Sequence, residues 1–305
     1  MSHGANSLKS IFFALGANLS IAIAKFVAAF ISGSGSMMAE AIHSTADSGN
    51  QLLLLLGLRH ARTPPNQDYP LGYGKAIYFW SFIVAVMLFS VGGLFSIYEG
   101  YHKLHSTQEL KMPYIAVGVL IFSIFAEGVS LLGALKEIKK ELNGRTYWQW
   151  FKTTRKSELL IVAGEDTAAL MGLFFALVAI LLTTFTKNPV YDATGSIVIG
   201  VLLVIIAILV GKQIMSLLIG SGVEKFKKTE YIKTLESYED IERILNLKTL
   251  QLGSDVMLAV KAKMIFFDSS IKMIDSINKI EADMKAKYPE IMWSFFEPDY
   301  EKNKD

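Results

Sequence analysis

The sequence predicts a polytopic α-helical membrane domain of six transmembrane helices, followed by a small α+β domain. Of the 305 residues, 52% are hydrophobic and only 19% are charged, which is typical of a membrane protein. After Gly222 the long apolar segments give way to charged residues and short alternating apolar runs. We therefore expect a transmembrane domain over residues 1–222 and a cytosolic domain over residues 223–305.

Six segments are long enough to cross a bilayer, which requires about 20 mostly apolar residues. Charged residues, Pro or Gly bound each segment. The very short connections 32–36 and 185–189 predict that helices one and two, and helices five and six, form hairpins. Trp148 and Trp150, in the longer connection 137–158, suit a membrane interface. The six segments are approximately 8–31, 37–58, 77–100, 113–136, 159–184 and 190–218.

The distribution of Lys and Arg predicts the orientation of these helices. Eleven lie in the terminus and loops of one side and three in the opposite loops, so by the positive-inside rule both termini are cytosolic. The short polar N-terminus precedes an apolar segment without a signal-peptide cleavage pattern, which indicates a retained helix. The absence of a transit peptide favours a bacterial cytoplasmic membrane. The eleven are Lys9, Arg59, Arg62, Lys75, Lys136, Lys139, Lys140, Arg145, Lys152, Arg155 and Lys156; the three are Lys103, Lys111 and Lys187.

The C-terminal segment predicts two helices that cover a three-stranded sheet, in the order αββαβ. About 83 residues bury a modest core, so we expect this domain to dimerise and the protein to be a homodimer. The expected elements are a helix over 229–238, strands over 244–252 and 255–264, a helix over 271–287 and a strand over 291–297.

Charge and cysteine content exclude several classes of function. A formal net charge of +2, without a basic stripe, excludes a nucleic-acid partner. The chain has no cysteine, so disulfides and thiolate metal sites are impossible, and nitrogen and oxygen atoms must hold any metal. The apolar composition excludes an ordinary soluble enzyme and indicates a protein in membrane lipid, and we expect no enzymatic activity.

Helix two carries polar residues that mark a functional site within the membrane, because charged groups there are costly. Glu40, His43, Asp47 and Gln51 fall within an arc of about 80°. His43 and Asp47 have the i, i+4 spacing that lets two side chains of one helix bind one ion. This face therefore predicts a metal site.

Helices four and five add three carboxylates to the candidate ligands. Counted at about 1.5 Å per residue, Asp47 lies about 15 Å, Glu127 about 21 Å and Asp166 about 27 Å from the outer ends of their helices. Glu165 precedes Asp166 in the sequence. Glu127 is open to three roles: a fourth ligand, a proton acceptor, or a structural partner for Lys25.

The donor set narrows the transported ion. One imidazole with two or three carboxylates suits zinc, manganese, iron(II) or cobalt, whereas calcium and magnesium prefer shells of oxygen alone. Zinc is expected first, because a four-coordinate nitrogen and oxygen site fits it well. The same side chains can accept protons once the metal leaves, so metal–proton exchange needs no further residues.

Several stretches resemble the cation diffusion facilitator family of zinc transporters. They are SGSGSMMAEAIHSTADSGNQLLLLLGLR at 32–59, PLGYGKAIYFW at 70–80, LLIVAGEDTAALMGL at 159–173, YDATGSIVIG at 191–200 and FFEPD at 295–299. The resemblance implies a homodimeric transporter with cytosolic termini and a metal site between helices two and five. It also implies proton-coupled export of zinc from the cytosol and a ferredoxin-like C-terminal domain.

The chain departs from the usual family pattern in helix five. Aligning the H-x-x-x-D pattern on Asp166 places Val162 where the His usually stands. The chain thus resembles a branch, including the animal mitochondrial zinc transporter, that has HxxxD in helix two and E-D in helix five. Glu165 lies about 100° around the helix from Asp166, so we favour Glu127 as fourth ligand if a protein group completes the shell, and water otherwise. The lost nitrogen leaves manganese, iron(II), cobalt and cadmium open as further substrates.

Two other classes of function remain as alternatives. A metal-permeable channel is disfavoured, because a compact His and Asp site binds tightly, and dependence on counter-transported protons would separate the two. A membrane scaffold or sensor is disfavoured because the tail lacks histidine, with Phe295 where relatives often have one. Asp255 and Asp268 are interpreted as solvated turn residues.

Overall fold

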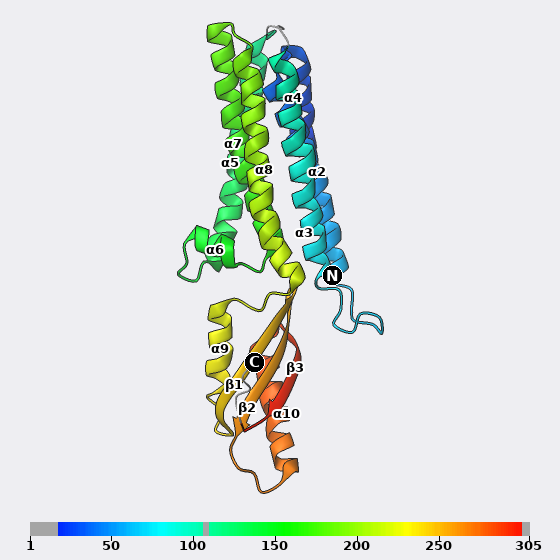
Figure 1. Cartoon of the computed structure of the whole chain (residues 1–305), viewed down its shortest axis with the longest axis vertical. Coiled ribbons are helices and arrows are strands. Elements are labelled where there is room, and N and C mark those ends of the chain that lie inside the picture. Colours follow the sequence, from blue (N-terminus) through cyan, green and yellow to red (C-terminus); the bar gives the residue numbers. More distant parts are fainter. Residues whose placement is uncertain (1–17, 106–109, 301–305) are drawn as a thin grey trace, which may run out of the picture. The chain divides into compact units, whose positions relative to one another are not determined.

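The computed structural model describes residues 18–105 and 110–300, which form two compact units (Figure 1). The first unit contains Phe79–Lys152, Ser157–Ile214 and the described part of Met1–Gly57. The second contains Leu58–Tyr78, Thr153–Lys156 and the chain from Met215 onward. The polar N-terminus and the beginning of the expected first helix lie outside the described residues, and the boundary at residue 222 stays a prediction.

The first unit is built from long helices, as the hydropathy pattern predicts. The first helix is described over Asn18–Ser32. Four helices of the described chain are long and apolar enough to cross a membrane: Ala76–Leu104, Pro113–Glu141 (α5), Ser157–Thr186 (α7) and Val190–Ile219 (α8). Helix α2, Gly35–Ala61, is a continuous helix of 27 residues, but polar residues interrupt its apolar sequence. A helical membrane domain is therefore confirmed, whereas six spans remain a prediction.

Two details of the helices differ from the sequence expectation. The third long helix consists of α3 (Ala76–Met87), a π-helical segment η1 (Leu88–Leu94) and α4 (Phe95–Leu104). The connection after α5 contains a short helix, α6 (Tyr147–Thr153), in which Trp150 is buried. Of the two tryptophans, Trp148 is exposed, and the location of both at a membrane interface stays a prediction.

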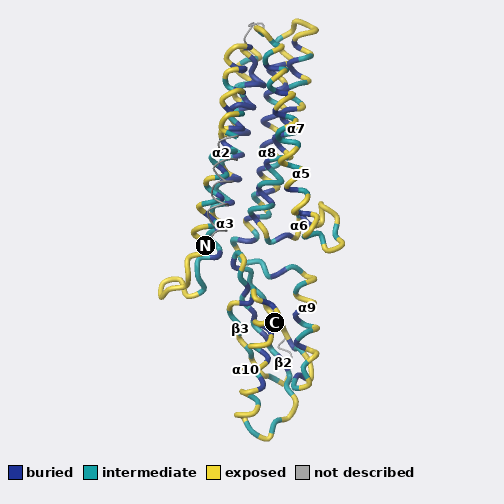
Figure 2. The backbone as a smooth tube through the Cα atoms, turned by 180° about the vertical axis from the view of Figure 1, so that it is seen from behind, coloured by how far each residue is buried: buried dark blue, intermediate teal, exposed yellow. Residues whose placement is uncertain are grey.

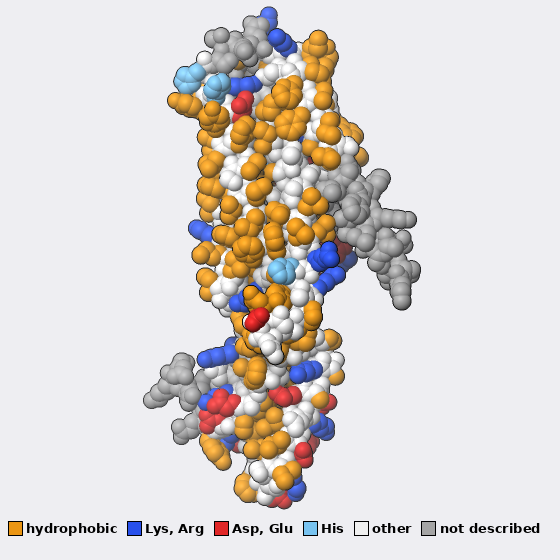
Figure 3. Space-filling model, turned by 90° about the vertical axis from the view of Figure 1, so that its right-hand side faces the viewer, with side chains coloured by type: hydrophobic (Ala, Val, Ile, Leu, Met, Phe, Trp, Pro, Cys, Tyr) orange, Lys and Arg blue, Asp and Glu red, His pale blue; other side chains and the backbone are white. Residues whose placement is uncertain are grey.

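Small residues bring the helices of the first unit close together. A Cβ atom on Gly200 of α8 would lie 2.6 Å from the carbonyl oxygen of Gly93, and one on Gly100 would lie 2.7 Å from that of Ala193. Such close backbone approach is typical of helix packing in membranes. Buried positions follow one side of the helices in Figure 2, and hydrophobic side chains cover much of the face of the helices that is seen in Figure 3.

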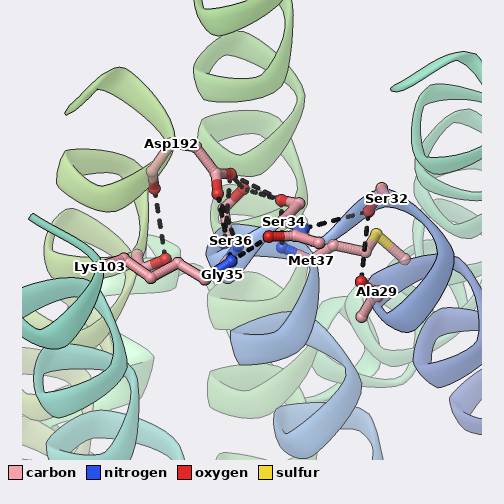
Figure 4. Close-up of polar contacts among 10 residues, drawn as sticks. Ala29, Ser32, Ser34, Gly35, Ser36, Met37, Lys103 and Asp192 are labelled. Carbon is pink, nitrogen blue, oxygen red and sulfur yellow. Dashed lines mark hydrogen bonds and ion pairs between the residues drawn. The ribbon is translucent and has the colours of Figure 1, made fainter. Parts of the chain in front are cut away.

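The N-terminus of α2 is capped by a carboxylate from another helix (Figure 4). Asp192, in the first turn of α8, accepts hydrogen bonds from the hydroxyl groups of Ser34 (2.6 Å) and Ser36 (2.5 Å) and from the backbone N–H of Gly35 (2.6 Å). The Lys103 ammonium lies 4.0 Å from Asp192. Because the first N–H groups of a helix lack intrahelical partners, this carboxylate fixes the start of the helix that carries His43.

The second unit contains the predicted order αββαβ. Its elements are α9 (Lys225–Leu235), β1 (Ile241–Leu252), β2 (Asp255–Met264), α10 (Ser270–Lys287) and β3 (Ile291–Pro298). The sheet order is β1-β2-β3, with β1 and β2 antiparallel and β2 and β3 parallel. Side chains of both helices share one core with alternate residues of the strands, so both helices cover the same face. Examples are Tyr231, Leu247, Leu258 and Ile280.

The second unit also holds the connection that follows α2. A Cβ atom on Gly74 would lie 2.1 Å from the carbonyl oxygen of Leu252, so only glycine allows this approach to the β1–β2 turn. The backbone N–H of Gly253, in that turn, donates to the Tyr78 hydroxyl at 3.1 Å. The turn is thus held against the connection by both packing and hydrogen bonding.

Candidate metal-binding site

His43 and Asp47 lie together on α2, as their spacing predicts. His43 is fully buried, and its Nε2 atom lies 3.5 Å from Oδ2 of Asp47. Within the described chain, neither ring nitrogen of His43 nor Oδ1 of Asp47 has a hydrogen-bond partner. Buried polar atoms nearly always have partners. These unpaired nitrogen and oxygen atoms are therefore suited to hold a metal ion.

The π-helical segment η1 lies against the His43 ring. A Cβ atom on Gly92 would be 3.7 Å from Nδ1 of His43, so the imidazole is enclosed between α2 and η1. Single turns of π-helix occur often at functional sites. Hydropathy counting gives no signal for such a segment, and the sequence analysis did not predict it.

The two acidic residues of α7 face different helices. The Asn50 side-chain amide of α2 donates to Glu165 Oε1 at 2.6 Å. The Ser130 hydroxyl of α5 donates to Asp166 Oδ2 at 2.9 Å. Adjacent residues on a helix are separated by about 100°, which explains why the two diverge. In this conformation it is therefore Glu165 that reaches α2, while Asp166 faces α5.

Glu127 of α5 is half-buried among the other candidates. Its charge acts electrostatically on Asp47, Glu165 and Asp166. However, among residues 18–105 and 110–300 no three His, Asp or Glu side chains are close enough to hold one metal ion. The structure thus brings His43 and Asp47 together, and in this conformation it does not bring a third candidate side chain into one cluster with them.

Asn50 of α2 is a further candidate ligand, which was not predicted from the sequence. It is fully buried, and its Oδ1 has no hydrogen-bond partner in the described chain. It follows His43 by seven residues and Asp47 by three, which places it on the same face of α2. That spacing was a usable signal, and an amide oxygen is a suitable ligand for a hard divalent ion.

Lys25 is paired differently from the alternative that the sequence left open, which was a pair with Glu127. Its ammonium contacts Glu40 and Ser44 of α2, and Lys25 is fully buried. Glu40 and Ser44 follow Lys25 by 15 and 19 residues in the sequence. They contact it because the first helix and α2 lie side by side.

Comparison with known proteins places the chain in a family. Residues 11–219 match the cation efflux transmembrane domain. The chain is 32% identical over 231 residues to the mitochondrial proton-coupled zinc antiporter SLC30A9 of Mus musculus, covering 75% of this chain and 41% of that protein. It is 31% identical over 262 residues to the same antiporter of Xenopus laevis, covering 85% and 46%. It is also 32% identical over 250 residues to metal tolerance protein C4 of Arabidopsis thaliana, covering 81% and 55%.

The chain spans about half the length of these curated relatives. The matched region nevertheless holds more than half of this chain and all five candidate ligands, namely His43, Asp47, Glu127, Glu165 and Asp166. Together with the four apolar helices, it identifies an integral membrane protein of a transport family rather than an enzyme family. The chain therefore belongs to the cation efflux family, the cation diffusion facilitators of zinc and other divalent metals.

Proposed function

We propose that this protein exports zinc from the cytosol in exchange for protons. The observation that carries the proposal is that His43 and Asp47 of α2 offer free ligand atoms. The ring nitrogens of His43 and Oδ1 of Asp47 are buried without hydrogen-bond partners in the described chain. The antiporters to which the chain is similar are named for proton-coupled zinc transport, which supports the same substrate and coupling here.

The exchange follows from the chemistry of the ligands. Zinc binds neutral imidazole and ionised carboxylates, so it must displace protons from His43, Asp47 and the acidic residues of α5 and α7. When zinc leaves, the same groups take up protons and carry them in the opposite direction. Because His43 is fully enclosed, the helices around it must move to expose the site to either side of the membrane.

Asp166 and Glu165 are the two candidates for the metal ligand that α7 supplies. The resemblance to the family supports Asp166 as a ligand, whereas the hydrogen bond from Asn50 supports Glu165. We propose that His43, Asp47 and Asp166 form the transport site, with Glu165 and Glu127 as the acidic groups that complete it or accept its protons.

The selectivity is proposed to extend beyond zinc. His43 is the single imidazole of the proposed site, and Asn50 adds an amide oxygen to the surrounding carboxylates. Harder ligand sets discriminate less against manganese and iron(II). Manganese or iron(II) transport by the same mechanism is therefore the second candidate function, and cobalt and cadmium are further substrates to test.

Each chain of the proposed transporter has six transmembrane helices with both termini in the cytosol, and a ferredoxin-like second unit. The transporter functions as a homodimer in membrane lipid, and we place it in a bacterial cytoplasmic membrane, although the relatives above include mitochondrial proteins. Accessibility of single introduced cysteines from each side of the membrane tests the orientation, since the chain has no native cysteine.

Transport by purified protein tests the function. Sealed proteoliposomes would be given zinc, manganese, iron(II), cobalt or cadmium in parallel, and metal uptake would be followed with wild type and His43→Ala. His60→Ala is a matched control, because His60 is exposed and its ring stacks on Tyr73. We expect zinc uptake by wild type and the control but not by His43→Ala. Equal uptake by all three proteins would reject the site.

A further inference from the structure

Lys25 and Glu40 form a buried ion pair next to the transport site. The Lys25 ammonium lies 3.3 Å from Oε2 of Glu40 and donates to the Ser44 hydroxyl at 2.6 Å. Both charged side chains are fully buried. A buried ion pair is weak evidence for stability, because desolvation offsets much of the attraction. Charged residues within membrane helices usually serve a function.

The Glu40 carboxylate is only partly satisfied by Lys25. Its other oxygen, Oε1, has no hydrogen-bond partner in the described chain. That oxygen points at α7, where a Cβ atom on Gly172 would lie 2.3 Å from it. Glycine at this position therefore makes room for the carboxylate. Glu40 thus lies between three helices: its own α2, the first helix and α7.

Glu40 continues the row of ligands on α2. It precedes His43 by three residues and Asp47 by seven, so these side chains follow one another on the same face at about 4.5 to 6 Å along the axis. Glu40 is the member nearest the N-terminal end of α2. The positive charge of Lys25 also acts on His43, Asp47 and Glu127. An ion that moves along this face from His43 toward the N-terminal end of α2 next meets Glu40, and Ser44 lies one turn from Glu40 on the side where Lys25 contacts both.

We propose that Glu40 and Ser44 form a second cation site on the transport path, which the Lys25 ammonium occupies whenever no metal is there. A carboxylate and a hydroxyl are ligands for divalent metal ions as well as for an ammonium. A metal ion that leaves His43 and Asp47 toward the N-terminal end of α2 displaces the ammonium, which returns behind it. Lys25 is thus a tethered cation that prevents the ion from moving back. This inference rests on the proposed metal transport.

Counting bound zinc tests the second site. Full-length protein would be purified as wild type, Lys25→Met, Lys25→Arg and the double variant Lys25→Met/Glu40→Gln, and equilibrium dialysis would measure zinc bound per chain. We expect Lys25→Met to bind one zinc ion more than wild type, because Glu40 and Ser44 are then free. Lys25→Arg keeps the tethered cation and should match wild type. The double variant should lose the additional ion.

The outcomes separate this inference from the proposed function. If wild type binds zinc through His43 and Lys25→Met binds no additional zinc, the second site does not exist. If wild type binds no zinc, the proposed function itself is wrong. Lys25→Gln, which keeps a hydrogen-bond donor for Ser44, is measured in parallel to separate a folding defect from a loss of the site. Failure of both neutral variants to fold would overturn the inference too, since the ammonium would then be a structural partner of Glu40.

Discussion

Asn50 donates a 2.6 Å hydrogen bond to Glu165, and this bond joins α2 directly to α7. Both side chains are buried. The helix that carries His43 and Asp47 is thereby connected to the helix that carries the acidic pair. The bond therefore holds Glu165 close to the face of α2 that carries His43 and Asp47.

Removal of the Asn50 amide should impair transport. Asn50→Ala leaves the buried Glu165 carboxylate without its donor, and a hydrogen bond to a charged group is worth about 1.5 to 3 kcal/mol. We expect zinc transport at limiting zinc to fall by roughly 10- to 100-fold, since each 1.4 kcal/mol corresponds to a factor of ten. Ser130→Ala, which removes the hydrogen bond to Asp166, is measured in parallel. Wild-type transport by Asn50→Ala would show that this bond has no part in the site.

Restoring an imidazole to α7 should narrow the selectivity. Val162→His places a His four residues before Asp166, the spacing that His43 and Asp47 already use. A second nitrogen makes the donor set softer, so competition assays should show a stronger preference for zinc and cadmium over manganese.

Ile161→His is the matched comparison for that variant. It places the imidazole four residues before Glu165, on the side of α7 that faces Asn50. If only Ile161→His shifts selectivity, Glu165 rather than Asp166 is the α7 ligand. If neither variant shifts the metal selectivity, residues 161 and 162 do not face the ion, and the proposed contribution of α7 to the site is wrong.

The cap on α2 should contribute to stability. Asp192→Asn replaces a carboxylate that accepts bonds from Ser34, Gly35 and Ser36 with an amide that has one acceptor oxygen, and complete loss of an N-terminal cap lowers stability by about 0.5 to 2 kcal/mol. The melting temperature of the purified protein should therefore decrease. Thr194→Ala, two residues along α8 at an exposed position, should leave it unchanged. An unaltered melting temperature in Asp192→Asn would mean that the cap adds nothing.

The second unit should lose stability in acid through Glu290. Burial acts to raise its pKa, but its backbone N–H, Lys227 and Tyr231 donate hydrogen bonds that hold the pKa below the ordinary value of 4.5. A carboxyl group with a lowered pKa stabilises the fold above the unfolded value, and the contribution disappears as pH falls through the folded value. Residues 223–305 should thus unfold more easily in urea below about pH 4 than at pH 7.

Glu290→Gln should remove part of that acid dependence, whereas Glu239→Gln, at an exposed position, should not. The segment has no histidine or cysteine, so we expect it to fold without metal. A chelator would be present in the measurements to test this expectation. The same pH dependence in both variants would exclude Glu290 as its source, and unfolding by the chelator would reveal a metal site that we do not expect.

Much of the architecture could be predicted from the sequence, because hydropathy and periodicity are local properties. They gave the long helices, the αββαβ order and the shared face of His43 and Asp47. The pairs Asn50–Glu165 and Lys25–Glu40 could not be predicted, since they depend on the rotation of each helix about its axis. Those rotations follow from close packing at glycines such as Gly172. The π-helical segment beside His43 was missed for the same reason, because it is a feature of packing rather than of composition.

Zinc-driven proton movement tests the central claim most directly. Proteoliposomes containing wild type or His43→Ala would enclose a pH-sensitive dye, with zinc added outside and no initial pH gradient. Zinc uptake through wild type should make the interior more alkaline as protons leave in exchange, and an imposed acidic interior should accelerate the uptake. His43→Ala should show neither effect. Zinc uptake by wild type without proton movement, at a rate indifferent to the pH gradient, would contradict exchange and indicate a channel.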